Sequence, residues 1–396
     1  MLWEGLLVKL SKWMVLLTVL LLSVALVAAG CGGGDKAGDQ KAAEGEKVIT
    51  IGFIGPLTGD VKTFGESTKN AFLLALEERN YKVGDFTIKT VTADDRNDAT
   101  EAVNVATKLI TQDKVQAIIG SVTSKCTIPI SEVANGNGVV MVTPTATNPA
   151  VTVADGKLKE YAFRACFIDP FQGTVAAKFA LDELKAKKAA ILFDQGNDYT
   201  IGLKDFFTEA FTKGGGQVLA TEAYTDKDTD FSAVLTNIAK LDIDVLYLPD
   251  YYQKVSLIGK QAREKGIKAV FLGGDGWDSS ELDFAAMEGG YFTNHYSPED
   301  PRPEVQEWVK KYEAKYGAKP DALATLAYDA TLILLKGIED ANSSDPAKIK
   351  DAIKALQNFQ TVSGSITYDE NNNPVKSAAI LQIKDGKQVF VKSVNP

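Results

Sequence analysis

Residues 120–149, GSVTSKCTIPISEVANGNGVVMVTPTATNP, contain the pattern that decides the fold class. The apolar run Val115–Ile119 leads into them and predicts a buried strand, and Val139–Thr143 predicts a second one. Between these strands, the spacing of apolar residues predicts a helix that begins near Ser124 and stops at Asn135–Gly136. The order strand, helix, strand predicts a parallel βαβ unit.

Each of these two strands is followed by a loop of small hydroxyl-bearing residues, Ser121–Ser124 and Pro144–Thr147. Parallel α/β sheets bind ligands at the carboxyl ends of their strands, where both loops would lie. A helix beginning near Ser124 would also offer free backbone N–H groups and its positive dipole end. The stretch therefore predicts a pocket for a small anionic group such as a carboxylate.

The same alternation of strand and helix patterns continues on both sides of this stretch and predicts two α/β units of similar size. The predicted strands are Val48–Ile54, Phe86–Val91, Val115–Ile119, Val139–Thr143, Tyr161–Phe167, Ala189–Phe193, Gln217–Ala223, Val245–Leu248, Ala269–Leu272, Ser365–Tyr368, Ala378–Lys384 and Gln388–Val394. The predicted helices are Glu66–Glu78, Thr100–Thr111, the helix from Ser124, Phe171–Lys185, Thr200–Lys213, Phe231–Lys240, Lys254–Lys265, Glu304–Tyr316, Asp321–Ala341 and Lys348–Gln357. We expect an α/β fold of two Rossmann-like lobes with parallel central sheets.

The N-terminus has the pattern of an export signal. Two lysines precede the apolar run Trp13–Val27, and small residues lead from it to Cys31. This pattern resembles a bacterial lipobox, which implies a signal peptide over 1–30 and lipidation of Cys31. The alternative is an uncleaved anchor helix. Residues 31–47 are rich in glycine, alanine and charge, and predict a flexible tether.

The composition excludes several function classes. Among 396 residues there is one histidine, His295, so a Ser–His–Asp triad or a histidine-based metal site would have to use it. We interpret His295 as a hinge or surface residue, and expect no enzyme activity, metal or cofactor. The net charge of −9, without a basic patch interleaved with aromatics, argues against nucleic acid as a partner. Cys126 and Cys166 could form a disulfide or stay as buried thiols.

Further candidate side chains follow predicted strands of the second lobe. Tyr199 and Tyr251 each follow one strand, and Asp275 and Trp277 follow another. A cleft between the lobes would thus place aromatics and one carboxylate opposite the hydroxyls of the first lobe.

Residues 48–396 carry an ordered set of motifs that resembles a known family. The motifs are IGFIGPLTG (51–59), Asp94–Asp95, GSVTS (120–124), TPTATNP (143–149), FRACFIDPFQG (163–173), DGWDS (275–279) and AYDA (327–330). Together they resemble the branched-chain amino-acid type of periplasmic binding proteins of ABC transporters. This resemblance implies the type I periplasmic binding protein fold, in which a three-crossing hinge joins two lobes that close like a Venus flytrap.

The resemblance also implies roles for residues of the first lobe. Ser124 would bind the ligand's α-carboxylate through its hydroxyl and nearby amides, and Thr147 would assist with its hydroxyl. Thr145 would present its backbone carbonyl to the ammonium group. Phe64 replaces a tyrosine common in the family and keeps an apolar wall. Asn97 and Thr123 occupy the places of a family disulfide, which this chain therefore lacks.

In the second lobe, the resemblance implies that Asp275 takes the place of a glutamate that pairs with the α-ammonium. Tyr199 and Tyr251 match aromatics that cover the ligand. Trp277 is larger than its counterpart in leucine-preferring relatives, which suggests a pocket for valine- or alanine-sized ligands.

These candidates also have simpler structural interpretations. Ser124 could only cap its helix, Thr145 and Thr147 could be turn residues, Tyr199 and Tyr251 could only pack between the lobes, Asp275 could form an Asp–Gly turn and Trp277 could belong to the core.

The expected function is capture of a small amino acid, branched-chain or otherwise aliphatic, and its delivery to an ABC transporter permease. The alternatives are a ligand-binding sensor domain and a binder of a small amide or urea-like solute. We expect a monomer that is exported and lipid-anchored to the outer face of the cell membrane, or located in the periplasm. The expected lobes comprise 48–165 plus 295–363 and 166–294 plus 364–396.

Overall fold

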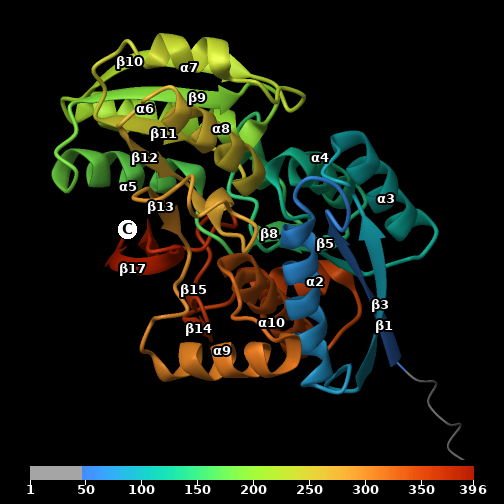
Figure 1. The fold of residues 1–396 in the computed structure, drawn as a ribbon. Coiled ribbons are helices and arrows are strands. Elements are labelled where there is room, and N and C mark those ends of the chain that lie inside the picture. The colour runs from blue at the N-terminus through green and yellow to red at the C-terminus, as the bar shows by residue number, and fades with distance from the viewer. Residues whose placement is uncertain (1–46) are drawn as a thin grey trace, which may run out of the picture. The chain divides into compact units, whose positions relative to one another are not determined.

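The computed structural model describes residues 47–396, which form two β-sheets with helices packed on them (Figure 1). The predicted signal peptide (1–30), the lipidation site Cys31 and the tether up to residue 46 lie outside the described residues. Within residues 47–396, no helix is both long enough and apolar enough to cross a bilayer.

The first sheet has the strand order β2-β3-β1-β4-β5-β8. All neighbours pair in parallel except β2, which is antiparallel to β3. The strands are β1 (Lys47–Gly55), β2 (Lys82–Val83), β3 (Phe86–Asp94), β4 (Ala117–Ile119), β5 (Val140–Thr143) and β8 (Ala162–Arg164). We call this sheet and the helices packed on it the first lobe. Those helices are α2 (Lys62–Glu77), α3 (Ala99–Thr111), α4 (Ser124–Gly136), α9 (Pro303–Tyr316), α10 (Ala322–Ala341) and α11 (Pro346–Lys354).

Alternation along β1 explains why helices cover both faces of this sheet. Ile51 and Phe53 pack with residues of α2, α10 and α11, whereas Ile54 packs with residues of α3 and α4. Successive side chains of a strand point to opposite faces, so an apolar strand needs a helical layer on each side. Burial of each such side chain contributes about 1.5–3 kcal/mol.

The second sheet has the order β10-β9-β11-β12-β13-β16-β17. Strands from β10 to β13 pair in parallel, and β16 and β17 add an antiparallel edge. The strands are β9 (Lys188–Asp194), β10 (Gln217–Tyr224), β11 (Val245–Leu248), β12 (Val270–Gly273), β13 (Tyr291–Asn294), β16 (Ala378–Lys384) and β17 (Lys387–Val394). This sheet and its helices form the second lobe. The helices are α5 (Asp169–Asp182), α6 (Asp198–Lys213), α7 (Ser232–Ile238) and α8 (Tyr252–Glu264).

The chain passes between the lobes three times, after β8, after β13 and before β16. Short hairpins, β6 (Val153–Ala154) with β7 (Lys157–Leu158) and β14 (Phe359–Thr361) with β15 (Gly364–Ile366), complete the strands. The predicted α/β class with two lobes and mostly parallel sheets is thus confirmed. The exact lobe boundaries expected from the sequence stay a prediction.

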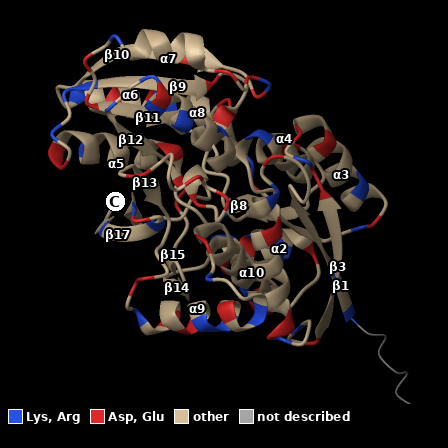
Figure 2. Ribbon diagram, in the orientation of Figure 1, with Lys and Arg blue, Asp and Glu red and all other residues tan. Residues whose placement is uncertain are grey.

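Charged residues of both signs are interspersed over the ribbon, as α9 illustrates (Figure 2). Lys311 lies 3.3 Å from Glu78, and Lys315 pairs with Glu77, so both pairs link α9 to the region of α2. Because these side chains are partly exposed, each pair contributes at most about 1 kcal/mol. The attachment of α9 depends mainly on its apolar face, where Val305, Trp308 and Tyr312 are buried.

Candidate functional site

A cavity lies where the carboxyl ends of strands from both lobes meet, as expected for parallel sheets. Its volume is about 20 Å³, so its walls lie close together. Its lining residues are Phe64, Val122, Thr123, Ser124, Thr145, Tyr199, Tyr251, Asp275, Gly276 and Leu323. Six of the residues expected at the site therefore lie together: Phe64, Ser124, Thr145, Tyr199, Tyr251 and Asp275.

The wall from the first lobe is built around the start of α4. Ser124 is the first residue of this helix, and its Oγ accepts a hydrogen bond from the Asn148 backbone N–H at 3.2 Å. Thr145 donates its hydroxyl to the Val122 carbonyl at 2.7 Å, which ties the two hydroxyl-bearing loops together. The N-terminal turn of a helix has free N–H groups and a positive dipole end, so this wall suits a carboxylate.

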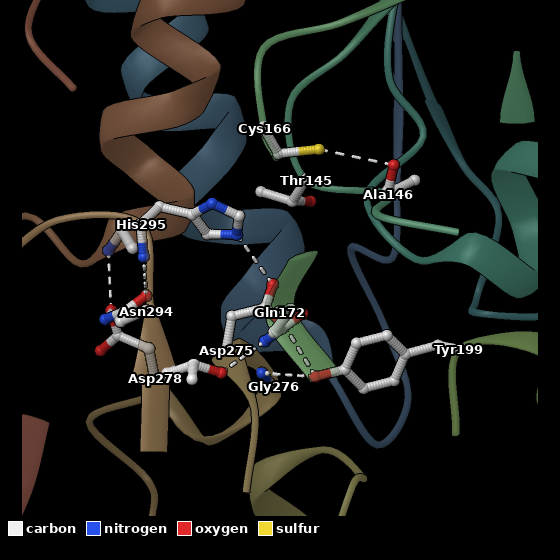
Figure 3. Close-up of polar contacts among 12 residues, drawn as sticks. Thr145, Ala146, Cys166, Gln172, Tyr199, Asp275, Gly276, Asp278, Asn294 and His295 are labelled. Atoms are coloured by element: carbon white, nitrogen blue, oxygen red, sulfur yellow. Dashed lines mark hydrogen bonds and ion pairs between the residues drawn. The ribbon is translucent and has the colours of Figure 1, made fainter. Parts of the chain in front are cut away.

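The wall from the second lobe is centred on the carboxylate of Asp275, on which three donors converge (Figure 3). Its Oδ1 accepts hydrogen bonds from Gln172 Nε2 and the Tyr199 hydroxyl, both at 2.8 Å. Its Oδ2 lies 3.0 Å from His295 Nε2. Burial raises the pKa of Asp275, but His295, Gln172 and Tyr199 outweigh it and hold the pKa below the ordinary value. The wall from the second lobe therefore carries a fixed negative charge on Asp275.

Aromatic rings separate the two polar walls. Tyr199 and Tyr251 stack with ring centroids 5.2 Å apart and planes 9° from parallel. Phe64 contacts Tyr251 edge-on, with centroids 5.7 Å apart, so a ring from the first lobe meets a ring from the second. Leu323 of α10 adds an aliphatic surface. These rings and Leu323 form an apolar surface between a carboxylate site and a buried negative charge.

Two residues expected at the ligand lie outside this cavity. The Trp277 ring is fully buried in the second lobe, where Nε1 donates to the Leu248 carbonyl at 3.0 Å. The short 3-10 turn Asp275–Trp277 directs Asp275 to the cavity and Trp277 back to the sheet. This position fits the core interpretation of Trp277, and the effect of the ring on ligand size stays a prediction. The Thr147 hydroxyl is also buried, beside the carboxyl group of Asp169.

Three residues of the site were missed or misplaced by the sequence analysis. Gln172 belongs to the motif FRACFIDPFQG, but nothing in the motif indicated that its amide would reach Asp275. Leu323 arrives from a helix far along the chain. His295 follows β13 where the chain returns to the first lobe, so its expected hinge position holds, but its side chain is fully buried rather than at the surface.

Cys126 and Cys166 are free, buried thiols, so the disulfide alternative is excluded. Burial raises the pKa of both thiols, which keeps them protonated and unreactive. At the position of the missing family disulfide, the Thr123 hydroxyl donates to Asn97 Oδ1 at 2.8 Å. A hydrogen bond thus joins the loop after β3 to the loop after β4. Among residues 47–396, no group of side chains is arranged to hold a metal ion.

Asp169 is a buried carboxylate beside the site, in the first turn of α5. Burial raises its pKa to about 8, against the opposing effects of Thr147 and Arg164. Because the folded protein favours the protonated form, this group's contribution to stability is lost as pH rises from about 4 toward 8.

We expect Asp169→Asn to remove this loss of stability with rising pH. Between pH 5 and 7, the unfolding free energy of the wild type should fall relative to the variant by about 1.4 kcal/mol per pH unit. Urea unfolding at several pH values measures this difference. Asp182→Asn, at an exposed position of the same helix, is the control. Parallel pH profiles for wild type and Asp169→Asn would contradict the prediction.

The family model described as "Periplasmic binding protein" matches residues 48–388. The chain is 35% identical to the Leu/Ile/Val-binding protein BraC3 of Rhizobium johnstonii over 331 residues, which cover 82% of this chain and 88% of the relative.

Two solved structures are also similar. The leucine binding protein LivK of Thermotoga maritima superposes with a TM-score of 0.84 at 39% identity, over 88% of this chain and 99% of that one. The branched-chain amino acid transporter substrate binding protein LivJ of Streptococcus pneumoniae, solved in complex with isoleucine, gives a TM-score of 0.82 at 30% identity. That match covers 88% of this chain and 100% of that one.

Proposed function

Because the chain belongs to the periplasmic binding protein family, we propose that it captures a small aliphatic amino acid and passes it to an ABC transporter permease. The family consists of binding proteins and not of enzymes, and it acts outside the cytoplasm. The observation that carries the proposal is the pairing of two opposite polar walls across one aromatic cavity. The start of α4 with Ser124 suits a carboxylate, and Asp275 suits an ammonium group.

We further propose that ligand binding is coupled to lobe closure. Three hydrogen bonds between the lobes involve residues next in sequence to ones that line the cavity. Thr63 Oγ1 lies 3.0 Å from Ser279 Oγ, the Tyr252 hydroxyl donates to the Asp60 carbonyl at 3.0 Å, and Asn148 Nδ2 donates to the Asp198 carbonyl at 2.9 Å. A ligand that bridges Ser124 and Asp275 would favour only the arrangement in which these contacts exist.

Lipidation of Cys31 would hold the protein at the outer face of the membrane, with residues 31–47 as its tether. This part of the proposal rests on the sequence pattern alone. Labelling with a radioactive fatty acid in a bacterial host tests it, because Cys31→Ser should abolish the label.

Thermal-shift and calorimetric screening of the purified protein against amino acids and small amides tests the ligand class. We expect leucine, isoleucine or valine to raise the melting temperature. If only a non-zwitterionic amide or urea did so, the alternative of an amide binder would replace the proposal. The sensor alternative is distinguished by transport: deletion of the gene should abolish uptake of the ligand.

Ser124→Ala is expected to weaken amino-acid binding by about 10- to 100-fold, because a hydrogen bond to a charged group contributes about 1.5–3 kcal/mol. Stability should fall by about 1 kcal/mol, because the substitution removes the acceptor of the Asn148 backbone N–H. Isothermal titration calorimetry measures the affinity, with the exposed substitution Ser344→Ala as control. Unchanged affinity would refute the carboxylate assignment.

A further inference from the structure

His295, the chain's one histidine, is joined to the carboxylate that would receive the ligand's ammonium group. Its side chain is fully buried, and Nε2 lies 3.0 Å from Asp275 Oδ2. The imidazole stacks on Phe167 with ring centroids 3.7 Å apart and planes 28° from parallel. The ring is therefore fixed in place, and only its protonation state can change.

The hydrogen bonds define the protonation state at neutral pH. Nδ1 of His295 is buried and has no hydrogen-bond partner among the described residues. A neutral ring with its proton on Nε2 donates to Asp275 and leaves Nδ1 as an unused acceptor. Protonation would instead bury an Nδ1–H without an acceptor, which costs about 1–3 kcal/mol.

Groups around His295 shift its pKa in opposite directions. Burial and the positive charge of Lys376 lower its pKa, whereas Asp275 and Asp278 raise it. The net effect places the pKa of His295 below its ordinary value. In the protein without ligand, the pair of Asp275 and His295 therefore carries one negative charge near neutral pH.

The single negative charge of the Asp275–His295 pair determines which ligand charge the site can balance. A carboxylate has about four acceptor positions, and Gln172, Tyr199 and His295 occupy three of those on Asp275. One position remains for an ammonium group, whose positive charge the pair balances while His295 is neutral. A carboxylic acid without an amine leaves the negative charge of Asp275 uncompensated in a buried site, which is costly. Protonation of His295 would remove this mismatch.

We propose that His295 links ligand class to protonation: its neutral form selects zwitterionic amino acids, and its protonated form admits simple aliphatic carboxylates of the same shape. This inference rests on the proposed function and deepens it. His295 acts through Asp275 and is a positioning residue. Binding of an amino acid should leave its protonation unchanged, whereas binding of a deamino analogue should draw one proton onto Nδ1 from solvent.

The test compares L-leucine with 4-methylpentanoate, its deamino analogue, on the full chain. Calorimetry in buffers of different ionisation enthalpy measures the protons taken up. At pH 7, we expect about one proton per 4-methylpentanoate and about none per leucine. The affinity for 4-methylpentanoate should then rise up to about tenfold per unit of falling pH in the range where the ligand-free protein holds His295 neutral.

His295→Gln provides the decisive control, because its amide can donate to Asp275 but cannot titrate in this range. We expect the variant to bind leucine, to bind 4-methylpentanoate weakly at every pH and to take up no proton. Equal proton uptake in the variant, or equal pH profiles for the two ligands in the wild type, would overturn the role of His295. Failure of the wild type to bind any aliphatic amino acid would instead overturn the proposed function itself.

Discussion

Asp275→Asn is expected to weaken leucine binding by about 100-fold or more, the largest effect on affinity of any single change considered. The substitution keeps the shape of the side chain and removes the one negative charge that, among residues 47–396, lines the cavity. It also places an amide N–H₂ among the donors of Gln172, Tyr199 and His295. Loss of one partner of a buried ion pair costs about 3–5 kcal/mol. Calorimetry with leucine at neutral pH measures the loss.

Asp278→Asn is a matched control for this prediction. Asp278 is also buried, three residues further along, where it accepts hydrogen bonds from Asn294 Nδ2 and the Ala322 N–H, both at 2.8 Å. It does not line the cavity. The control should lower stability but leave affinity within a few-fold of wild type. If Asp275→Asn bound leucine as tightly as this control, the ammonium assignment would be wrong.

Trp277→Ala is expected to lower the free energy of unfolding by about 3–5 kcal/mol, because it empties a large space in a packed core. The ring lies against Gly273, where an added Cβ would come within 2.2 Å of it, and its centroid is 5.9 Å from that of Phe292. Denaturant unfolding measures the change.

Trp277→Phe separates packing from hydrogen bonding in this prediction. Phenylalanine retains most of the ring and loses the bond to the Leu248 carbonyl, so a smaller cost of about 1–2 kcal/mol is expected. Neither variant should bind larger amino acids, since Trp277 does not border the cavity. A stable Trp277→Ala variant that gained affinity for phenylalanine would show that the ring does limit the ligand after all.

Much of the site was predictable because local patterns determine where strands end. Ser124, Thr145 and Tyr251 follow strands whose apolar runs are clear in the sequence, and parallel pairing brings such ends together. These patterns do not predict the direction in which a side chain within a loop points. The tight turn after β12 sends Asp275 and Trp277 to opposite sides, although they are only two residues apart.

The burial of His295 beside Asp275 could not be predicted from the sequence, because it depends on long-range pairing. It follows β13, a four-residue strand that was not predicted, and this strand is fixed between β12 and β16. Gln172 reaches Asp275 only because α5 packs near β13. Contacts between residues more than a hundred positions apart leave no local signal.

The antiparallel edge of the second sheet has a consequence for biosynthesis. Strand β13 pairs with β16, which is separated from it by the whole run of α9, α10 and α11 in the first lobe. While a ribosome is still making those helices, β13 presents an open row of backbone donors and acceptors. The second lobe therefore reaches its final form only after residues 378–394 have been synthesised, so its sheet stays incomplete while α9, α10 and α11 are made.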